Sequence, residues 1–382
     1  MYLTMLFFLI VFFAVVVFVQ IVYYLFVFGA FSYTKSSSKN TPNTKKQPVS
    51  VIICAKNEAE NLTKHLPLIL EQDYPVFEIV LINDASYDGT IEIMEAFAEK
   101  HKNIKIVDVK EVDTNVNWSS KKYALTLGIK AASYDCLLLT DADCAPSSKN
   151  WIAEIAASFS AEKTIVLGYG GYETLPTFLN KLIRFETLLT ALQYFSWAKR
   201  GNPYMGVGRN LAYKKEHFFG ANGFVDHMKI LSGDDDLFIN GVANYKNTTI
   251  VATPESFTRS LPKETYADWI EQKRRHISTA KYYKFKDRVL LGLFYVSQLL
   301  FLVLSIALLA TTAIMNYQIL LYAVLGIIGV RYLISFFSVG FAASKLKEKN
   351  LVVWYPVLEF LLIFIQISLF ITNLFLKPNR WR

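Results

Sequence analysis

Cysteines, repeats and biased tracts are scarce in this chain of 382 residues. Its three cysteines, Cys54, Cys136 and Cys144, lack the spacing of metal ligands, so we expect reduced structural thiols. There is no internal repeat and no low-complexity tract, so a repeat architecture is not indicated. The net charge of +8 does not require a nucleic-acid partner, because the basic residues flank apolar segments and suit an anionic membrane surface.

Charge is absent from the first 34 residues. Residues 2–28 are apolar and exceed the roughly 20 residues that a membrane-spanning helix needs. A signal peptide is the alternative, but the basic N-terminal region and a small-residue cleavage site are both missing, and the apolar core is too long. We therefore predict a transmembrane helix over 1–30 and a polar linker over 31–47.

Three further apolar stretches, 289–315, 319–343 and 351–375, predict a C-terminal membrane region over 289–376 of about three helices. Lysines beside these stretches place the polar middle of the chain and the 345–349 loop in the cytoplasm, by the positive-inside rule. If each of the four spans crosses the membrane in turn, the tail 377–382 lies outside the cytoplasm, although its basic residues favour the cytoplasm. The count of four spans stays open, because 351–356 could be an interfacial or re-entrant piece.

Two charges lie inside these apolar stretches, Arg331 in the second and Glu359 in the third. Charges at membrane depth are costly and usually paired. Counted from the shared loop, their depths differ by about four residues, or roughly 6 Å of helix rise, which an arginine can bridge. We predict an Arg331–Glu359 ion pair, either purely structural or lining a path for a lipid head group.

Strands and helices alternate in the polar middle, which predicts an α/β fold with a mostly parallel sheet and crossover helices. The expected strands are 49–55, 77–82, 104–107 and 134–140, and the expected helices are 57–72, 89–100, 121–132 and 237–243.

The strand expected at 134–140 runs directly into Asp141 and Asp143. In an extended chain residues i and i+2 point the same way, so both carboxylates face one side. Ligands bind at the carboxyl ends of parallel strands. Two oxygen donors there suit Mg²⁺ or Mn²⁺ carrying a diphosphate, whereas the plainer alternative is a pair of structural aspartates in a turn.

Six segments follow one another along the chain: Val49-Ser-Val-Ile-Ile-Cys-Ala-Lys-Asn-Glu58, Asn83-Asp-Ala-Ser-Tyr-Asp-Gly-Thr90, Leu139-Thr-Asp-Ala-Asp143, Gly206-Val-Gly-Arg-Asn-Leu-Ala212, Gly233-Asp-Asp-Asp236 and Gln272-Lys-Arg-Arg-His276. In this order they resemble the motifs of family 2 glycosyltransferases of the GT-A fold. The resemblance covers about 48–286 and implies a Rossmann-like catalytic domain over 48–262 and an amphipathic interfacial helix over 263–288. The flanking spans resemble the membrane-integrated members, such as polysaccharide synthases and ceramide glucosyltransferases.

The resemblance assigns donor-binding roles. Glu58 and Asp84 would accept hydrogen bonds from the nucleoside, and Lys121 at a helix start would face the diphosphate. Asp143 would coordinate the metal ion, with Asp141 beside it contacting both the metal and the nucleotide-sugar. The alternatives are helix capping for the first two carboxylates and a solvated surface lysine.

The resemblance also assigns the acceptor side of the reaction. Asp235 would be the general base, with Asp234 as its neighbour, because crowded carboxylates have raised pKa values. The alternative is an acidic helix N-cap. On the donor side, Gln272 and Arg275 would hold the diphosphate from the amphipathic helix, and the alternative is a solvated basic surface. The family motif ends in Trp where this chain has His276, which disfavours processive synthesis.

The sequence therefore predicts a metal-dependent, inverting glycosyltransferase of a bacterial inner membrane, with its catalytic domain in the cytoplasm. It would use a nucleotide-sugar, a UDP-sugar by resemblance, and a lipid or glycan acceptor. One alternative is a processive polysaccharide synthase that extends and exports a polymer. The other is a non-catalytic membrane scaffold that keeps the fold.

Overall fold

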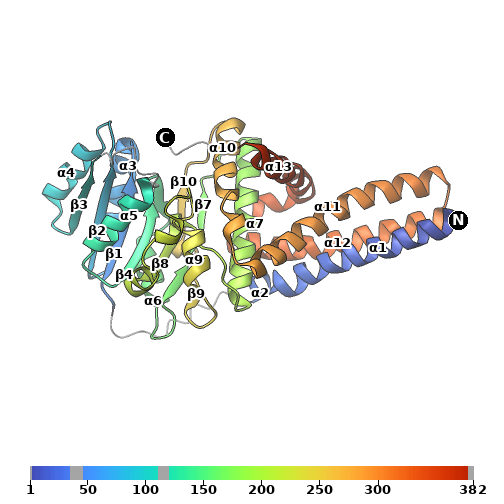
Figure 1. Cartoon of the computed structure of the whole chain (residues 1–382), viewed down its shortest axis with the longest axis horizontal. Coiled ribbons are helices and arrows are strands. Elements are labelled where there is room, and N and C mark those ends of the chain that lie inside the picture. The colour runs from blue at the N-terminus through green and yellow to red at the C-terminus, as the bar shows by residue number, and fades with distance from the viewer. Residues whose placement is uncertain (1, 35–45, 111–119, 377–382) are drawn as a thin grey trace.

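The computed structural model describes residues 2–34, 46–110 and 120–376, which form an α/β domain and a rod of long apolar helices (Figure 1). The predicted tail 377–382 and most of the predicted linker lie outside these residues.

The main sheet has seven strands in the order β3-β2-β1-β4-β8-β6-β9. The first four are parallel, β8 runs antiparallel to both β4 and β6, and β9 is parallel to β6. All four expected strands are confirmed, and two of them extend two residues further than expected. The strands are β1 (Val49–Ala55), β2 (Phe77–Asp84), β3 (Ile104–Val109), β4 (Cys136–Asp141), β6 (Ile165–Leu167), β8 (Leu211–Lys214) and β9 (Thr248–Ile250).

Two hydrophobic cores cover the two faces of this sheet, because adjacent strand residues point to opposite sides. Ile52 of β1 belongs to the core shared with α5 and α7, whereas its neighbour Ile53 belongs to the core shared with α3, α4 and α6. Both side chains are about 1% exposed. The helices are α3 (Ala59–Leu70), α4 (Thr90–Lys100), α5 (Ser120–Ala131), α6 (Trp151–Ala157), α7 (Phe178–Lys199), α8 (Lys215–Gly220) and α9 (Asp236–Val242).

A small second sheet, in the order β5-β10-β7, lies beyond the carboxyl end of β4. Its strands are β5 (Cys144–Pro146), β7 (Gly170–Tyr172) and β10 (Thr258–Ser260). The strand β5 begins directly after the two aspartates, so this sheet adjoins the edge where they lie.

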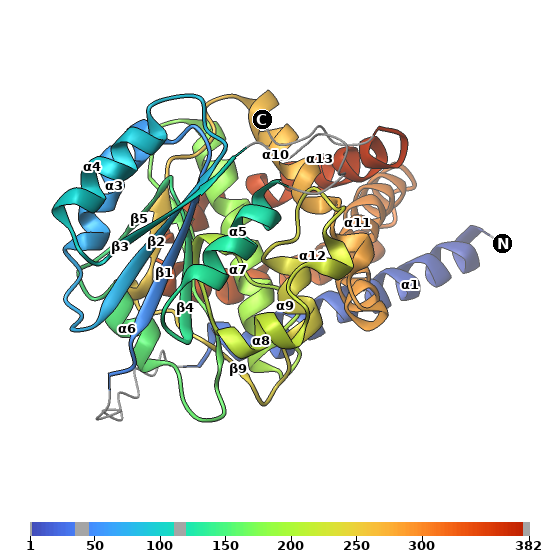
Figure 2. The same cartoon turned by 60° about the vertical axis from the view of Figure 1, so that its left-hand side comes forward.

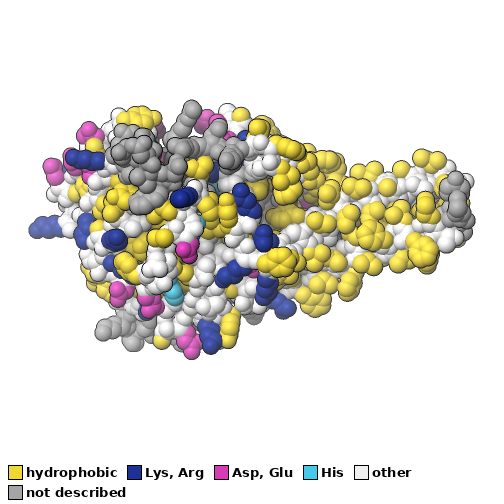
Figure 3. Space-filling model, viewed as in Figure 1, with side chains coloured by type: hydrophobic (Ala, Val, Ile, Leu, Met, Phe, Trp, Pro, Cys, Tyr) yellow, Lys and Arg dark blue, Asp and Glu magenta, His cyan; other side chains and the backbone are white. Residues whose placement is uncertain are grey.

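Three helices form the rod: α1 (Tyr2–Val22), α11 (Phe285–Ile314) and α12 (Gln318–Lys345). A π-helical turn (Tyr23–Val27) and the short α2 (Gly29–Ser32) continue α1 toward the α/β domain. Apolar side chains cover the rod, and lysines and arginines gather near its base (Figure 3). Among the described residues, four helices are long and apolar enough to cross a membrane, these three and α13 (Tyr355–Phe375).

The helix α13 does not join the rod. It lies crosswise at the base, beside α7 and α10 (Tyr266–Ile277), as the two views in Figure 1 and Figure 2 show. The segment 263–288, which the sequence predicts as one interfacial helix, contains α10, a short 3₁₀ turn (Ala280–Tyr282) and the first turn of α11. Just after α10 ends, the Thr279 hydroxyl donates to Asp236 of the α/β domain.

The predicted Arg331–Glu359 ion pair is confirmed. Two guanidinium nitrogens of Arg331 contact the two carboxylate oxygens of Glu359 at 2.7 and 2.6 Å, which is a bidentate geometry. Gln20 accepts from the same guanidinium at 2.9 Å, and Tyr24 donates to the carboxylate at 3.0 Å. The pair therefore joins α12 and α13 to the end of α1, with both charges at most 3% exposed.

Removing one partner of this pair should destabilise the protein strongly. We expect Arg331→Met to lower the free energy of unfolding by about 3–5 kcal/mol, because it leaves Glu359 charged and unpaired. The double variant Arg331→Met/Glu359→Met should recover much of that loss. Thermal unfolding in detergent measures both, and equal destabilisation in the single and double variants would contradict this view.

Candidate functional site

The carboxyl ends of β1, β2 and β4 meet at one edge of the main sheet. Cys54 of β1 is in register with Asp141 of β4, and Ala55 is in register with Asn83 of β2. Asp84, the last residue of β2, therefore lies at the same edge as Asp141 and is 4% exposed. The structure thus brings together carboxylates that the sequence placed after separate strands.

Glu58 lies at the start of α3, close to this edge. Its carboxylate accepts a hydrogen bond from Asn61 at 2.6 Å and makes no capping bond to the helix. Burial raises its pKa, and the negative charges of Asp143 and Asp141 raise it further. The capping alternative therefore fails for Glu58. It applies instead to Asp88, which accepts the backbone N–H groups at the starts of α3 and α4.

Asp141 and Asp143 form a compact acidic pair with Cys144. The ligand atoms of these three side chains all lie within 4.8 Å of one another. The Cys144 thiol donates to Asp143 at 3.4 Å, and burial, followed by the charge of Asp141, raises the pKa of Asp143. Carboxylate oxygens are the ligands that Mg²⁺ and Mn²⁺ prefer, so the two aspartates fit such an ion.

Lys121 connects this acidic pair to a distant part of the chain. Its ammonium group lies 3.0 Å from Asp141 and 3.3 Å from Asp234, and its side chain is 12% exposed. Burial lowers the pKa of Lys121, but the two carboxylates outweigh it and raise the pKa well above the usual value. Lys121 is therefore a permanently charged bridge between the end of β4 and the segment before α9.

The next residue, Lys122, has a different role. It is fully buried, and its ammonium group donates to three backbone carbonyls, those of His227, Ile230 and Ser232, at 2.7–2.9 Å. Lys122 therefore holds the loop that precedes Asp234 and α9.

Asp235 occupies the N-cap of α9 with its side chain partly buried. One carboxylate oxygen accepts the backbone N–H of Gly208 at 2.7 Å, and the other accepts that of Asp236 at 2.7 Å. The chain can enter this cap because Gly233 adopts a φ of +99°, where a Cβ atom would lie 2.5 Å from Leu237.

The ionisation of Asp235 is unusual. Burial, together with the charges of Asp234 and Asp236, raises its pKa to about 7. A carboxyl group with this pKa can accept a proton near neutral pH. Asp235 is also the N-cap of α9. Helix capping and the role of a general base are therefore compatible at this residue.

The third acidic residue of this run, Asp236, is structural. Its carboxylate accepts hydrogen bonds from Thr279 and, at 2.6 Å, from Tyr283. Both donors lie between α10 and α11. Asp236 therefore ties α9 to the beginning of the membrane region.

Arg275 of α10 faces the acidic residues. Burial lowers its pKa, while the charges of Asp234 and Asp141 favour its protonated form. Gln272 lies three residues earlier and so on the same helix face, with its side chain partly buried. His276, which stands where the family has Trp, is exposed.

Arg209 was not among the predicted site residues. Its guanidinium lies 4.3 Å from the Tyr172 ring and donates to the carbonyl of Gly171 at 3.1 Å. Burial lowers its pKa, but Tyr172 and nearby acidic groups, including Asp143, outweigh it and raise the pKa. The segment 206–212 was recognised in the sequence, but nothing in it indicated that its arginine approaches the aspartates.

Three comparisons with known proteins agree with this architecture. Residues 50–220 match the family model of glycosyl transferase family 2. The probable glycosyltransferase YdaM of Bacillus subtilis is 27% identical over 292 residues, which cover 70% of this chain and 67% of that protein. The poly-beta-1,6-N-acetyl-D-glucosamine synthase of Staphylococcus epidermidis is 40% identical over 95 residues, but these cover only 25% of this chain and 21% of that enzyme.

Among solved structures, the mannosyltransferase PcManGT of Pyrobaculum calidifontis, in complex with GDP-Man and Mn²⁺, has a TM-score of 0.56 and 18% identity. The match covers 87% of this chain and 98% of that chain, and it shows the shared fold. The matched region, residues 50–220, is thus a glycosyltransferase family 2 domain with a GT-A-like sheet, and long apolar helices flank it.

Proposed function

We propose that the protein is an inverting glycosyltransferase that moves a sugar from a nucleotide-sugar, in the first instance a UDP-sugar, to a hydroxyl group of a membrane lipid. The observation that carries this proposal is the Lys121 bridge, 3.0 Å from Asp141 and 3.3 Å from Asp234. The bridge holds the sheet edge suited to a diphosphate beside the segment that carries the candidate base, Asp235.

In this proposal Glu58 and Asp84 accept hydrogen bonds from the nucleoside of the donor. Lys121 and Arg275 face the diphosphate and favour the charge that develops on it as it leaves. A divalent cation held by Asp143, with Asp141, would supply further positive charge to the departing diphosphate.

Asp235 acts on the acceptor side. Its carboxylate removes the proton of the acceptor hydroxyl while that oxygen attacks the anomeric carbon from the face opposite the diphosphate. The new carbon–oxygen bond forms as the bond to the diphosphate breaks, so the anomeric configuration inverts. The N–H groups of Gly208 and Asp236 hold the carboxylate, which keeps the base oriented.

Single transfer to a lipid is favoured over polymer synthesis. Arg275 lies on α10, which is bonded to the apolar α13, so the acceptor meets the site beside the membrane helices. His276 replaces the aromatic residue on which a growing polymer would stack. Polymer synthesis is the second candidate, and the 40% identity to the poly-N-acetylglucosamine synthase over 95 residues favours it.

A donor panel distinguishes these products. Membranes containing the protein are incubated with radiolabelled UDP- and GDP-sugars and Mn²⁺, and the products are separated into organic-soluble, polymeric and free-sugar fractions. We expect label in the organic phase with one sugar per lipid, and loss of transfer with EDTA that Mn²⁺ restores. A polymer ladder would exclude single transfer, and the anomeric configuration of the product tests inversion.

Removing the candidate base should abolish transfer without abolishing donor binding. We expect Asp235→Asn to lower kcat by about 10²–10⁴-fold, because the amide cannot accept the proton. The matched control is Asp226→Asn, an exposed carboxylate nearby that should leave kcat unchanged. Donor affinity and thermal unfolding, measured for both variants, separate loss of the base from loss of the fold. Full activity in Asp235→Asn would remove this assignment.

The pH dependence follows from the raised pKa of Asp235, about 7. The base must be ionised, so kcat/KM should rise about tenfold per pH unit below this pKa and level off above it. Initial rates between about pH 5.5 and 8.5, at saturating metal, measure the profile. A rate that falls as pH rises through 7 would contradict a carboxylate base.

A further inference from the structure

We propose that α13 does not cross the membrane. It lies parallel to the membrane plane in the headgroup region of the cytoplasmic leaflet, between the α/β domain and the lipid. The protein therefore has three membrane-spanning helices and a cytoplasmic C-terminus. The inference goes beyond sugar transfer and does not depend on it. It is carried by contacts at both ends of α13.

The first end of α13 follows a loop that is bonded to the α/β domain. Glu348 is fully buried and forms ion pairs with Arg184 of α7 and, at 3.2 Å, with Arg259 of β10. Trp354, the N-cap of α13, packs against Phe178 with 6.2 Å between ring centroids. The helix therefore begins on the domain side of the membrane region.

The last turn of α13 is bonded to the same side. Arg274 of α10 donates to the side chain of Asn373 at 3.1 Å and to the carbonyl of Leu376 at 2.9 Å, and Asn373 donates back at 2.9 Å. The helix α10 is fixed to the α/β domain, because Lys273 forms an ion pair with Glu186 of α7, and Thr279, just after the helix, donates to Asp236 of α9.

The length of α13 makes these contacts decisive. Its 21 residues extend about 30 Å, which is the thickness of the hydrocarbon core. A helix of this length that crossed the membrane would have its ends on opposite sides. Both ends of α13 instead contact the domain side, through Trp354 at the first end and Asn373 at the last.

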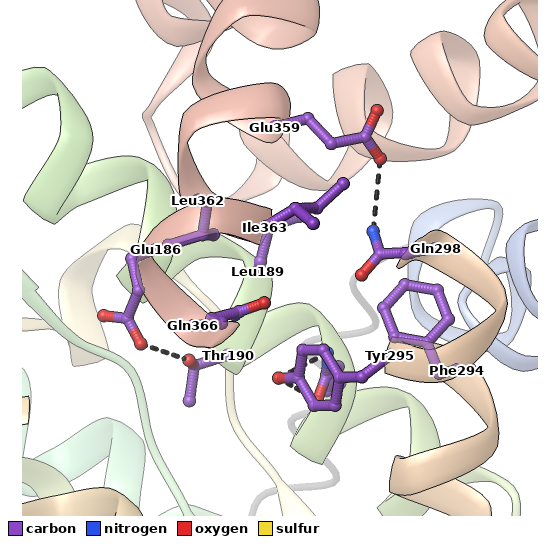
Figure 4. A pocket seen from close by; sticks show the side chains of 11 residues that line it. Glu186, Leu189, Thr190, Phe294, Tyr295, Gln298, Glu359, Leu362, Ile363 and Gln366 are labelled. Atoms are coloured by element: carbon purple, nitrogen blue, oxygen red, sulfur yellow. Dashed lines mark hydrogen bonds between the residues drawn. The ribbon is translucent and has the colours of Figure 1, made fainter. Parts of the chain in front are cut away.

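One face of α13 packs on protein. Its Glu359, Leu362 and Ile363 meet α7 and α11 in the narrow crevice of Figure 4, where Gln298 of α11 donates to Glu359 at 3.2 Å. These contacts account for the polar residues on this side of the helix.

The opposite face is apolar and exposed. Most of the exposed apolar residues are spaced by three, four or seven positions and so form one stripe along the helix. Hydrocarbon is the occupant that fits, because the stripe continues the exposed apolar surface of the rod and nothing else in the described chain covers it. The stripe comprises Val357, Phe360, Phe364, Ile371, Leu374 and Phe375, which are 42–81% exposed.

The distribution of charge agrees with three spans. The turn 315–317, between α11 and α12 at the far end of the rod, has no charged residue, whereas 345–349 at the near end has three lysines. With α13 in the plane of the membrane, the basic residues of 377–382 also belong to the cytoplasmic side. The positive-inside rule is then satisfied at every loop.

Paired topology reporters test this inference in the full chain. Alkaline phosphatase, which is active only after export, and green fluorescent protein, which fluoresces only in the cytoplasm, are each fused after Arg382. Fusions after Asn316 and Lys347 are the exported and cytoplasmic controls. We expect the Arg382 fusions to match those after Lys347. Phosphatase activity equal to that of the Asn316 fusion would overturn the proposal.

Cysteine labelling in the unfused protein provides a second measurement. Asn316→Cys should react with a membrane-impermeant maleimide in intact cells, whereas Leu376→Cys, at an exposed position, should react only after permeabilisation. The three native cysteines belong to the α/β domain, and labelling of the protein without an added cysteine measures their background signal. Labelling of Leu376→Cys in intact cells would show that α13 crosses.

Discussion

The site depends on one buried cation shared by two carboxylates. Lys121 holds Asp141 of the parallel half of the sheet and Asp234 of the segment before α9, which lie 93 residues apart in the chain. Without it, Asp234, whose side chain is 14% exposed, and Asp141, whose side chain is 32% exposed, would repel each other with no cation between them. Because both carboxylates bond to the same ammonium group, the edge with the candidate metal ligands and the candidate base become parts of one site.

Sequence patterns predicted the elements of this site better than their connections. Buried strands show as continuous apolar runs, so the strand before Asp141 and the edge where it ends could be read directly. The family resemblance matched Lys121 to the diphosphate but gave Lys122 no definite role, because a motif does not show where each side chain points. On a helix their side chains point about 100° apart, so one meets carboxylates and the other meets backbone carbonyls. The role of Arg209 depends likewise on the second sheet, which the sequence did not indicate.

In the apolar helices, too, the sequence predicts the elements but not the contacts between them. Hydropathy reports length and composition, and by both measures α13 resembles a span. What sets its orientation is polar bonding at its two ends, by Glu348 before it and Asn373 within its last turn, which hydropathy does not measure. The Arg331–Glu359 pair could nevertheless be predicted from the sequence. An unpaired charge in an apolar setting is so costly that two opposite charges at similar depth are expected to pair.

The helix α9 links the candidate base to the start of the apolar helix α11. Asp235 caps the helix, while Asp236 binds Thr279 and Tyr283, and Asn240 donates to the buried Asp287 in the first turn of α11 at 2.9 Å. The candidate base is therefore attached through one short helix to the point where a membrane helix begins. A lipid whose hydroxyl group stays at headgroup level would meet the base at a constant height, whereas a soluble acceptor would gain nothing from this attachment.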